Sequence, residues 1–148
     1  MSNFAPMARI IGIDYGTKRT GLATTDPLQI IASPLETVET AKVFDYLKTY
    51  FFMEEIERII IGEPKKLDDS EAEIMPKIRL FVAELTRLFP EIPIDFQDER
   101  YTSSDAKRII LASGIPKMKR RDKGLVDKIS ASIILTEWME AAGKWSRY

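Results

Sequence analysis

The chain of 148 residues contains neither cysteine nor histidine. Without a thiolate or an imidazole it cannot build a cysteine or histidine zinc site, and Ser-His-Asp and Cys-His catalysis are excluded as well. Any acid–base or metal chemistry must therefore rest mainly on Asp and Glu, with Lys and Tyr as lesser options. Carboxylate oxygens are hard ligands, so the expected cofactor is Mg²⁺ or Mn²⁺.

Long apolar runs are missing too. No run approaches the roughly 20 residues that span a bilayer, and residues 1–6 are polar and broken by a proline, unlike a signal peptide. The absence of cysteine fits a reducing cytosol. We therefore expect a cytoplasmic protein with no membrane partner.

The composition is that of an ordinary globular protein, with 45% hydrophobic and 30% charged residues. This length suits one compact domain, and we expect a single domain over residues 1–148 with its core at about residues 8–142. The net charge is only −1, so binding to nucleic acid would need a local basic patch.

The hydrophobic pattern predicts five strands and four helices. The strands are expected at residues 8–14, 19–25, 28–33, 58–62 and 93–97. The helices are expected at residues 40–52, at about 74–88, from residue 102 or 103 to 114, and at about 125–142. Ser70 and Glu73 form a possible capping box before the second helix, and Pro76 either kinks that helix or marks a later start.

The turns between the first three strands are so short that these strands should form an antiparallel meander. The later strands are joined by helical crossovers and should add parallel to the sheet. The expected fold is therefore α/β, with a mixed five-stranded sheet of three antiparallel strands and then two parallel strands, flanked by helices.

Three carboxylates lie at the ends of these elements. Asp14 ends the first strand, Glu99 follows the fifth strand, and Asp127 starts the final helix. Ligands gather outside the carboxyl ends of strands joined by crossovers. If the three carboxylates converge there, they repel each other unless cations neutralise them, as in a two-metal phosphodiesterase site. Each acid alone also fits a structural role in a turn, in a solvated loop or at a helix start; their joint placement favours function.

Three segments carry a resemblance to a known family. They are Ile-Gly-Ile-Asp-Tyr-Gly-Thr-Lys-Arg-Thr-Gly-Leu-Ala at residues 11–23, Asp-Glu-Arg-Tyr-Thr at 98–102 and Val-Asp-Lys-Ile-Ser-Ala-Ser-Ile-Ile-Leu at 126–135. In this order they resemble the YqgF/RuvX-type proteins, which have an RNase H-like fold related to RuvC Holliday junction resolvases. Members of the family are assigned as junction resolvases or as nucleases that mature the 5′ end of pre-16S ribosomal RNA. The resemblance implies a nuclease with a carboxylate site of Asp14, Glu99 and Asp127.

Two departures from the family pattern bear on this site. Glu63 stands where the family usually has leucine, between Gly62 and Pro64, and is either an extra metal ligand or a residue that faces solvent. Lys128 places an extra charge beside Asp127. Asp98 is a second alternative ligand, because the sequence does not decide between it and Glu99.

Basic residues indicate where nucleic acid would bind. The candidates are Lys18, Arg19, Arg100, Lys117, Lys119, Arg120, Arg121 and Lys123. Most of them crowd into one segment just before Asp127, where they could bind phosphates, although a charge run is more often a solvated surface. Tyr15 and Tyr101 lie beside the acids and could stack on bases or pack in the core.

Other functions stay open. Residues 12–18 also resemble the first phosphate loop of the actin, heat-shock-protein and sugar-kinase ATPases, although those proteins close two such domains over the nucleotide. A non-catalytic nucleic-acid-binding domain is a third alternative.

A junction resolvase needs a dimer to cut two strands symmetrically. The sequence offers no decisive dimer surface and is consistent with a monomer or a weak homodimer. We therefore favour 5′-end processing of pre-16S ribosomal RNA over Holliday junction resolution.

Overall fold

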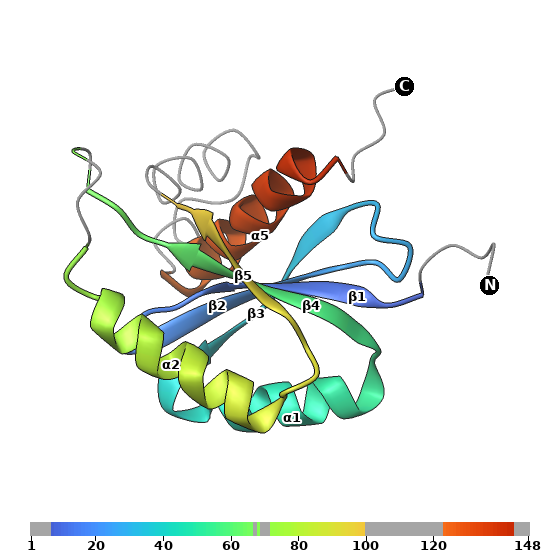
Figure 1. Ribbon diagram of the computed structural model, residues 1–148, viewed down its shortest axis with the longest axis horizontal. Coiled ribbons are helices and arrows are strands. Elements are labelled where there is room, and N and C mark those ends of the chain that lie inside the picture. Colours follow the sequence, from blue (N-terminus) through green and yellow to red (C-terminus); the bar gives the residue numbers. More distant parts are fainter. Residues whose placement is uncertain (1–6, 67, 69–71, 100–122, 144–148) are drawn as a thin grey trace.

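A computed structural model describes residues 7–66, 68, 72–99 and 123–143 of the chain (Figure 1). Five strands form one sheet in the order β3-β2-β1-β4-β5. The strands are β1 (Arg9–Asp14), β2 (Arg19–Thr25), β3 (Ala32–Glu39), β4 (Ile56–Glu63) and β5 (Ile94–Asp98). β1, β2 and β3 pair antiparallel, whereas β4 and β5 add parallel to β1. The mixed sheet expected from the sequence is confirmed.

Helices cover both faces of this sheet, as Figure 1 shows. A short 3-10 turn, η1 (Thr40–Lys42), leads into α1 (Val43–Met53), and α1 lies with α2 (Met75–Leu88) on one face. The final helix, α5 (Lys123–Ala141), lies on the other face. The helix expected between residues 102 and 114 falls outside the described residues.

The apolar runs of β1 and β4 are explained by burial on both faces. Side chains alternate along a strand, so Ile11 and Ile13 join the core beneath α1 and α2, while Ile10 joins the core beneath α5. Ile59 and Ile60 of β4 divide between the two cores in the same way. These central strands hold the edge of the sheet, where Asp14 lies, in a fixed position.

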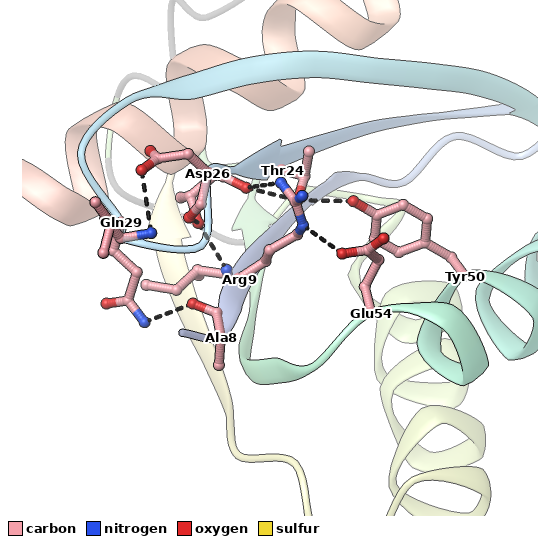
Figure 2. A network of polar contacts seen from close by, with 10 residues as sticks. Ala8, Arg9, Thr24, Asp26, Gln29, Tyr50 and Glu54 are labelled. Atoms are coloured by element: carbon pink, nitrogen blue, oxygen red, sulfur yellow. Dashed lines mark hydrogen bonds and ion pairs between the residues drawn. The ribbon is translucent and has the colours of Figure 1, made fainter. Parts of the chain in front are cut away.

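The third strand begins later than expected, because residues 28–31 form a tight loop instead of a strand. The carboxylate of Asp26 accepts hydrogen bonds from the backbone N–H groups of Leu28, Ile30 and Ile31 at 2.8–3.1 Å. Gln29 adopts φ 60° in this loop, and its side-chain amide donates to the carbonyl of Ala8 at 3.0 Å (Figure 2). The prediction of a strand at 28–33 was therefore wrong in its start, because the local hydrogen bonds of Asp26 outweigh the β propensity of Ile30 and Ile31.

The second helix also starts later than a capping box at Ser70 and Glu73 would place it. α2 begins at Met75 and carries Pro76 in its first turn, where a missing backbone N–H costs nothing. Glu73 precedes the helix, and Ser70 lies outside the described residues. Of the two alternatives for Pro76, the later helix start is the one observed.

Within the described ranges, none of the helices α1, α2 and α5 is both long and apolar enough to cross a bilayer.

Candidate functional site

The carboxyl ends of β1, β4 and β5 bring two acids together. Asp14 is the last residue of β1, and Glu99 follows β5 directly, its N–H donating to the carbonyl of Glu63 at 3.2 Å. Ile13 faces α1 and α2, so the alternation of the strand directs Asp14 to the face that α5 covers. The side chains of Asp14 and Glu99 are hydrogen-bonded to each other.

Gly62 makes room for this contact on the intervening strand β4. A Cβ atom on Gly62 would lie 2.8 Å from both Cδ and Oε2 of Glu99 and 2.7 Å from Cδ1 of Ile134. Real Cβ contacts are not this short, so any larger residue at position 62 would push the Glu99 carboxyl group away. The glycine therefore lets Glu99 lie across β4 towards Asp14.

Burial and nearby negative charges raise the pKa values of these two carboxyl groups. Burial raises the pKa of Asp14 to about 6; the hydrogen bond with Glu99 opposes that rise, and the negative charge of Asp127 adds to it. The pKa of Glu99 is raised further, by burial and then by the charge of Asp14. Near neutral pH the pair therefore keeps a proton between its two groups. A cation placed between them would oppose both shifts, because its positive charge stabilises the ionised carboxylates.

Asp127 reaches the same region from α5. The backbone of α5 at Asp127 lies so close to β2 that a Cβ on Gly21 would overlap the Asp127 carbonyl group. Gly21 is the residue of β2 that pairs with Asp14 in the sheet register. Asp127 is thus held above the end of β1, close enough for its charge to raise the pKa of Asp14.

The carboxylate of Asp127, however, is bound by an arginine. Nε of Arg19, the first residue of β2, donates to Oδ2 of Asp127 at 2.8 Å. Among the residues that the structure describes, no three acidic side chains lie close enough to form a complete metal-binding group. Asp14 and Glu99 are in contact, whereas Asp127 lies near them but is paired with Arg19.

The two alternative acids lie on neighbouring strands. Glu63 and Asp98 pair with each other in the register of β4 and β5. Nζ of Lys65 lies 3.8 Å from Oε1 of Glu63, and the charge of Asp98 contributes to the raised pKa of Glu99. The side-chain hydrogen bond of Asp14 is made with Glu99.

The structure describes some of the basic residues that the sequence suggests for nucleic-acid binding. Lys18 is exposed in the turn after β1, next to Arg19, and Lys123 is the first residue of α5. The remaining candidates lie outside the described residues: Arg100, Lys117, Lys119, Arg120 and Arg121.

The ring of Tyr15 packs against Phe81 with centroids 4.9 Å apart, so this tyrosine belongs to the core beneath α2.

Sequence reasoning missed a groove beside Asp127. Its volume is about 330 Å³, and its lining is Arg19, Glu36, Thr37, Val38, Glu39, Gly124 and Lys128. The hydroxyl group of Thr37 donates to the carbonyl of Gly124 and so joins β3 to the start of α5. No local pattern marks this groove, because it depends on the β3 register and on the position of α5.

The fold defines the class of protein. The mixed sheet, with helices on both faces and acids at the carboxyl edge of its central strand, is the RNase H-like arrangement. Among solved structures the chain is similar to T. thermophilus RuvC in complex with Holliday junction substrate, with a TM-score of 0.54 and 15% sequence identity. That match covers 92% of this chain and 96% of the other, and it shows the shared fold.

Sequence comparison shows the family. Residues 8–141 match the family described as "RuvX: Holliday junction resolvase". A protein of Christiangramia forsetii is 49% identical over 90% of this chain and 98% of its own length, and one of Porphyromonas gingivalis is 52% identical over 90% and 97%. Both carry the name "Putative pre-16S rRNA nuclease".

The chain therefore belongs to the RuvX family, and the resemblance found in its sequence is confirmed. Since the relatives are named as nucleases and the family as a resolvase, the enzyme class is that of a nuclease, a hydrolase. Family membership favours this class over the ATP-binding and non-catalytic alternatives.

Proposed function

We propose that this chain is a divalent-metal-dependent nuclease that hydrolyses phosphodiester bonds during 5′-end processing of pre-16S ribosomal RNA. The observation that carries the proposal is the proton-sharing pair of Asp14 and Glu99 at the carboxyl edge of the sheet. The names of the relatives from Christiangramia forsetii and Porphyromonas gingivalis support the RNA substrate. The absence of membrane-spanning helices among the described elements is consistent with a cytoplasmic site of action.

The donor chemistry of the pair fits Mg²⁺ or Mn²⁺. Both groups are carboxylates, they lie in direct contact, and burial leaves each of them short of water. Asp14 and Glu99 would hold the ion, and Asp127 would complete the set of ligands from α5. A bound divalent ion stabilises charge on the phosphate and lowers the pKa of a coordinated water molecule.

The chain's own residues would orient the substrate around this centre. Asp14 has a fixed position because β1 is buried between two helical layers. We assign binding of the nucleic-acid backbone to Lys18, Arg19, Arg100, Lys117, Lys119, Arg120, Arg121 and Lys123. Contacts of lysine and arginine with phosphates fix the register of a strand on a protein, and they weaken as salt is added.

The test is a cleavage assay with Mg²⁺ or Mn²⁺ on a ribosomal RNA precursor and a four-way DNA junction, side by side. We expect cleavage of the RNA at its 5′ end and little cleavage of the junction. Chelation with EDTA should abolish cleavage, and added Mg²⁺ should restore it. Cleavage that persists in EDTA would contradict the metal-dependent mechanism.

Holliday junction resolution is the second candidate, favoured by the description of the family and by the fold shared with RuvC. Symmetric cutting of a junction needs two centres related by a twofold axis. Sedimentation measurements with and without a junction would distinguish the candidates, because a resolvase should bind as a dimer. A monomer or weak homodimer that cuts only the RNA precursor supports the first function.

The shared proton predicts how stability depends on pH without metal. Asp14 and Glu99 have raised pKa values in the folded protein, so their contribution to stability is complete below their ordinary pKa values of about 4. It is lost as the pH rises through about 6, the pKa of Asp14, and beyond. In EDTA the free energy of unfolding should therefore be about 4 kcal/mol lower at pH 8 than at pH 5, since each extra proton on the folded pair contributes about 1.4 kcal/mol per pH unit. Urea melts at the two pH values measure this difference.

Glu99→Gln is the matched variant for that experiment. Its amide can still donate a hydrogen bond to Asp14 but cannot ionise, so stability should change less between pH 5 and pH 8. Mg²⁺ should stabilise the wild-type protein at pH 8 and have little effect on the variant. The same pH dependence in the wild-type protein and in Glu99→Gln would show that the pair does not share a proton.

A further inference from the structure

The ion pair with Arg19 occupies the carboxylate of Asp127, which the proposed metal site needs as its third ligand. Nε of Arg19 is 2.8 Å from Oδ2 of Asp127, and the two side chains are 41% and 23% exposed. The guanidinium group is thus open to solvent, while the carboxylate that it binds is mostly covered. A ligand from solution can reach the arginine without any movement of the fold.

Two positively charged groups would compete for the carboxylate of Asp127. One is Arg19, which binds it in this structure. The other is a cation beside Asp14, since the charge of Asp127 already acts on the Asp14 carboxyl group. An ion pair with arginine lowers the tendency of a carboxylate to bind a metal, because both cations compete for the same oxygen lone pairs.

The groove next to Arg19 offers a place for a group that would compete for the arginine. Arg19 and Lys128 supply positive charge to its lining, and Glu39 is paired with Lys42 at 3.0 Å. The carboxylate of Glu36 accepts the backbone N–H of Thr37 at 3.1 Å. A phosphodiester group is an anion whose oxygens match the donor geometry of a guanidinium group. It is also the repeating unit of the proposed substrate.

We propose that Arg19 holds Asp127 away from the metal site until a backbone phosphate of the nucleic acid binds Arg19, so that substrate binding completes the set of metal ligands. Arg19 is then a positioning residue that acts through Asp127. This inference rests on the proposed function and adds to it a coupling between substrate and metal. By linkage, nucleic acid should strengthen metal binding, and metal should strengthen nucleic-acid binding by the same factor.

The experiment measures Mn²⁺ affinity by calorimetry, with and without a short phosphorothioate RNA that resists hydrolysis. RNA alone is titrated to correct for its own Mn²⁺ binding. In the wild-type protein the RNA should strengthen Mn²⁺ binding about tenfold. Arg19→Gln frees Asp127, so it should bind Mn²⁺ about tenfold more tightly without RNA and gain little when RNA is added.

Asp127→Asn separates this proposal from a simple ligand role. If Arg19 holds Asp127 away, this variant should match the wild-type Mn²⁺ affinity without RNA and lack the increase with RNA. Arg87→Gln is the control, because Arg87 pairs with Glu84 at 2.5 Å on α2, away from the site. It should behave as the wild-type protein does in every titration.

Two results would overturn the inference and leave the proposed function intact. The first is Mn²⁺ affinity unchanged in Arg19→Gln, provided that its thermal melt shows a folded protein. The second is a loss of Mn²⁺ affinity in Asp127→Asn without RNA, which would make Asp127 a ligand from the start. If the wild-type protein binds no Mn²⁺ with or without RNA, the proposed function falls and this inference falls with it.

Discussion

Replacing Asp14 by asparagine is expected to lower the single-turnover cleavage rate about a thousandfold, which corresponds to about 4 kcal/mol of transition-state stabilisation. The carboxylate lies at the end of the buried central strand β1, in contact with Glu99. Asparagine keeps the shape of the side chain but removes the charge that a divalent ion needs. Because one of two repelling acids is gone, the variant should be at least as stable as the wild-type protein in metal-free buffer.

Asp45→Asn serves as the control for charge removal. Asp45 is an exposed residue in the first turn of α1, on the opposite face of the sheet from α5. The cleavage rate of the Asp45→Asn variant should stay within about twofold of the wild-type rate, since an exposed charge far from the site contributes little to the energetics of the site. A thermal melt, a binding titration and a single-turnover rate are measured on each protein. Wild-type cleavage by Asp14→Asn would remove this residue from the site and leave it a turn residue before Gly16.

Replacing Gly21 by alanine is expected to lower the free energy of unfolding by about 3 kcal/mol, because an added methyl group in a packed interior forces the backbone apart. The new Cβ atom would overlap the carbonyl group and the backbone nitrogen at the junction of Asp127 and Lys128. A helix backbone cannot turn aside as the end of a flexible side chain can, so the start of α5 must move. The melting temperature should fall by about 10 °C for a chain of this size. Cleavage should fall as well, since Asp127 moves with the helix.

Gly62→Ala is the matched comparison for that experiment. Its Cβ atom would meet the Glu99 carboxyl group and Cδ1 of Ile134, both of which end flexible side chains. We therefore expect a smaller loss of stability, about 1 kcal/mol, together with a large loss of cleavage because Glu99 is displaced from Asp14. Equal losses of stability in the two variants would show that the backbone contact at Gly21 is not tight.

Much of the fold follows from the periodicity of the sequence. The short isoleucine runs of β1 and β4 predict strands buried on both faces, and short turns between β1, β2 and β3 favour antiparallel pairing. The positions of Asp14 and Glu99 at strand ends follow from the same pattern. The resemblance of residues 11–23, 98–102 and 126–135 to the RuvX family added the nuclease function, which periodicity alone does not give.

Local side-chain chemistry limited the accuracy of element boundaries. The third strand begins at Ala32 rather than at residue 28, because Asp26 binds three backbone N–H groups in the loop before it. Hydrophobicity marks Ile30 and Ile31 as strand residues, yet both are exposed. The sequence contains Asp26, but a pattern of apolar residues does not show which N–H groups a carboxylate will bind.

The sequence by itself determined the mixed sheet and the acids at the ends of its strands, and the lack of cysteine and histidine left carboxylates as the main candidates for metal ligands. Only the tertiary structure decided that Glu99 contacts Asp14, that Gly62 makes room for that contact, and that Arg19 binds Asp127. Arg19 and Asp127 are 108 positions apart, and they meet because α5 lies directly on Gly21 of β2. Periodicity along a strand or helix reports which face of that element is buried. A contact between side chains so distant in sequence depends instead on the position of the helix on the sheet. The packing of the whole chain fixes that position.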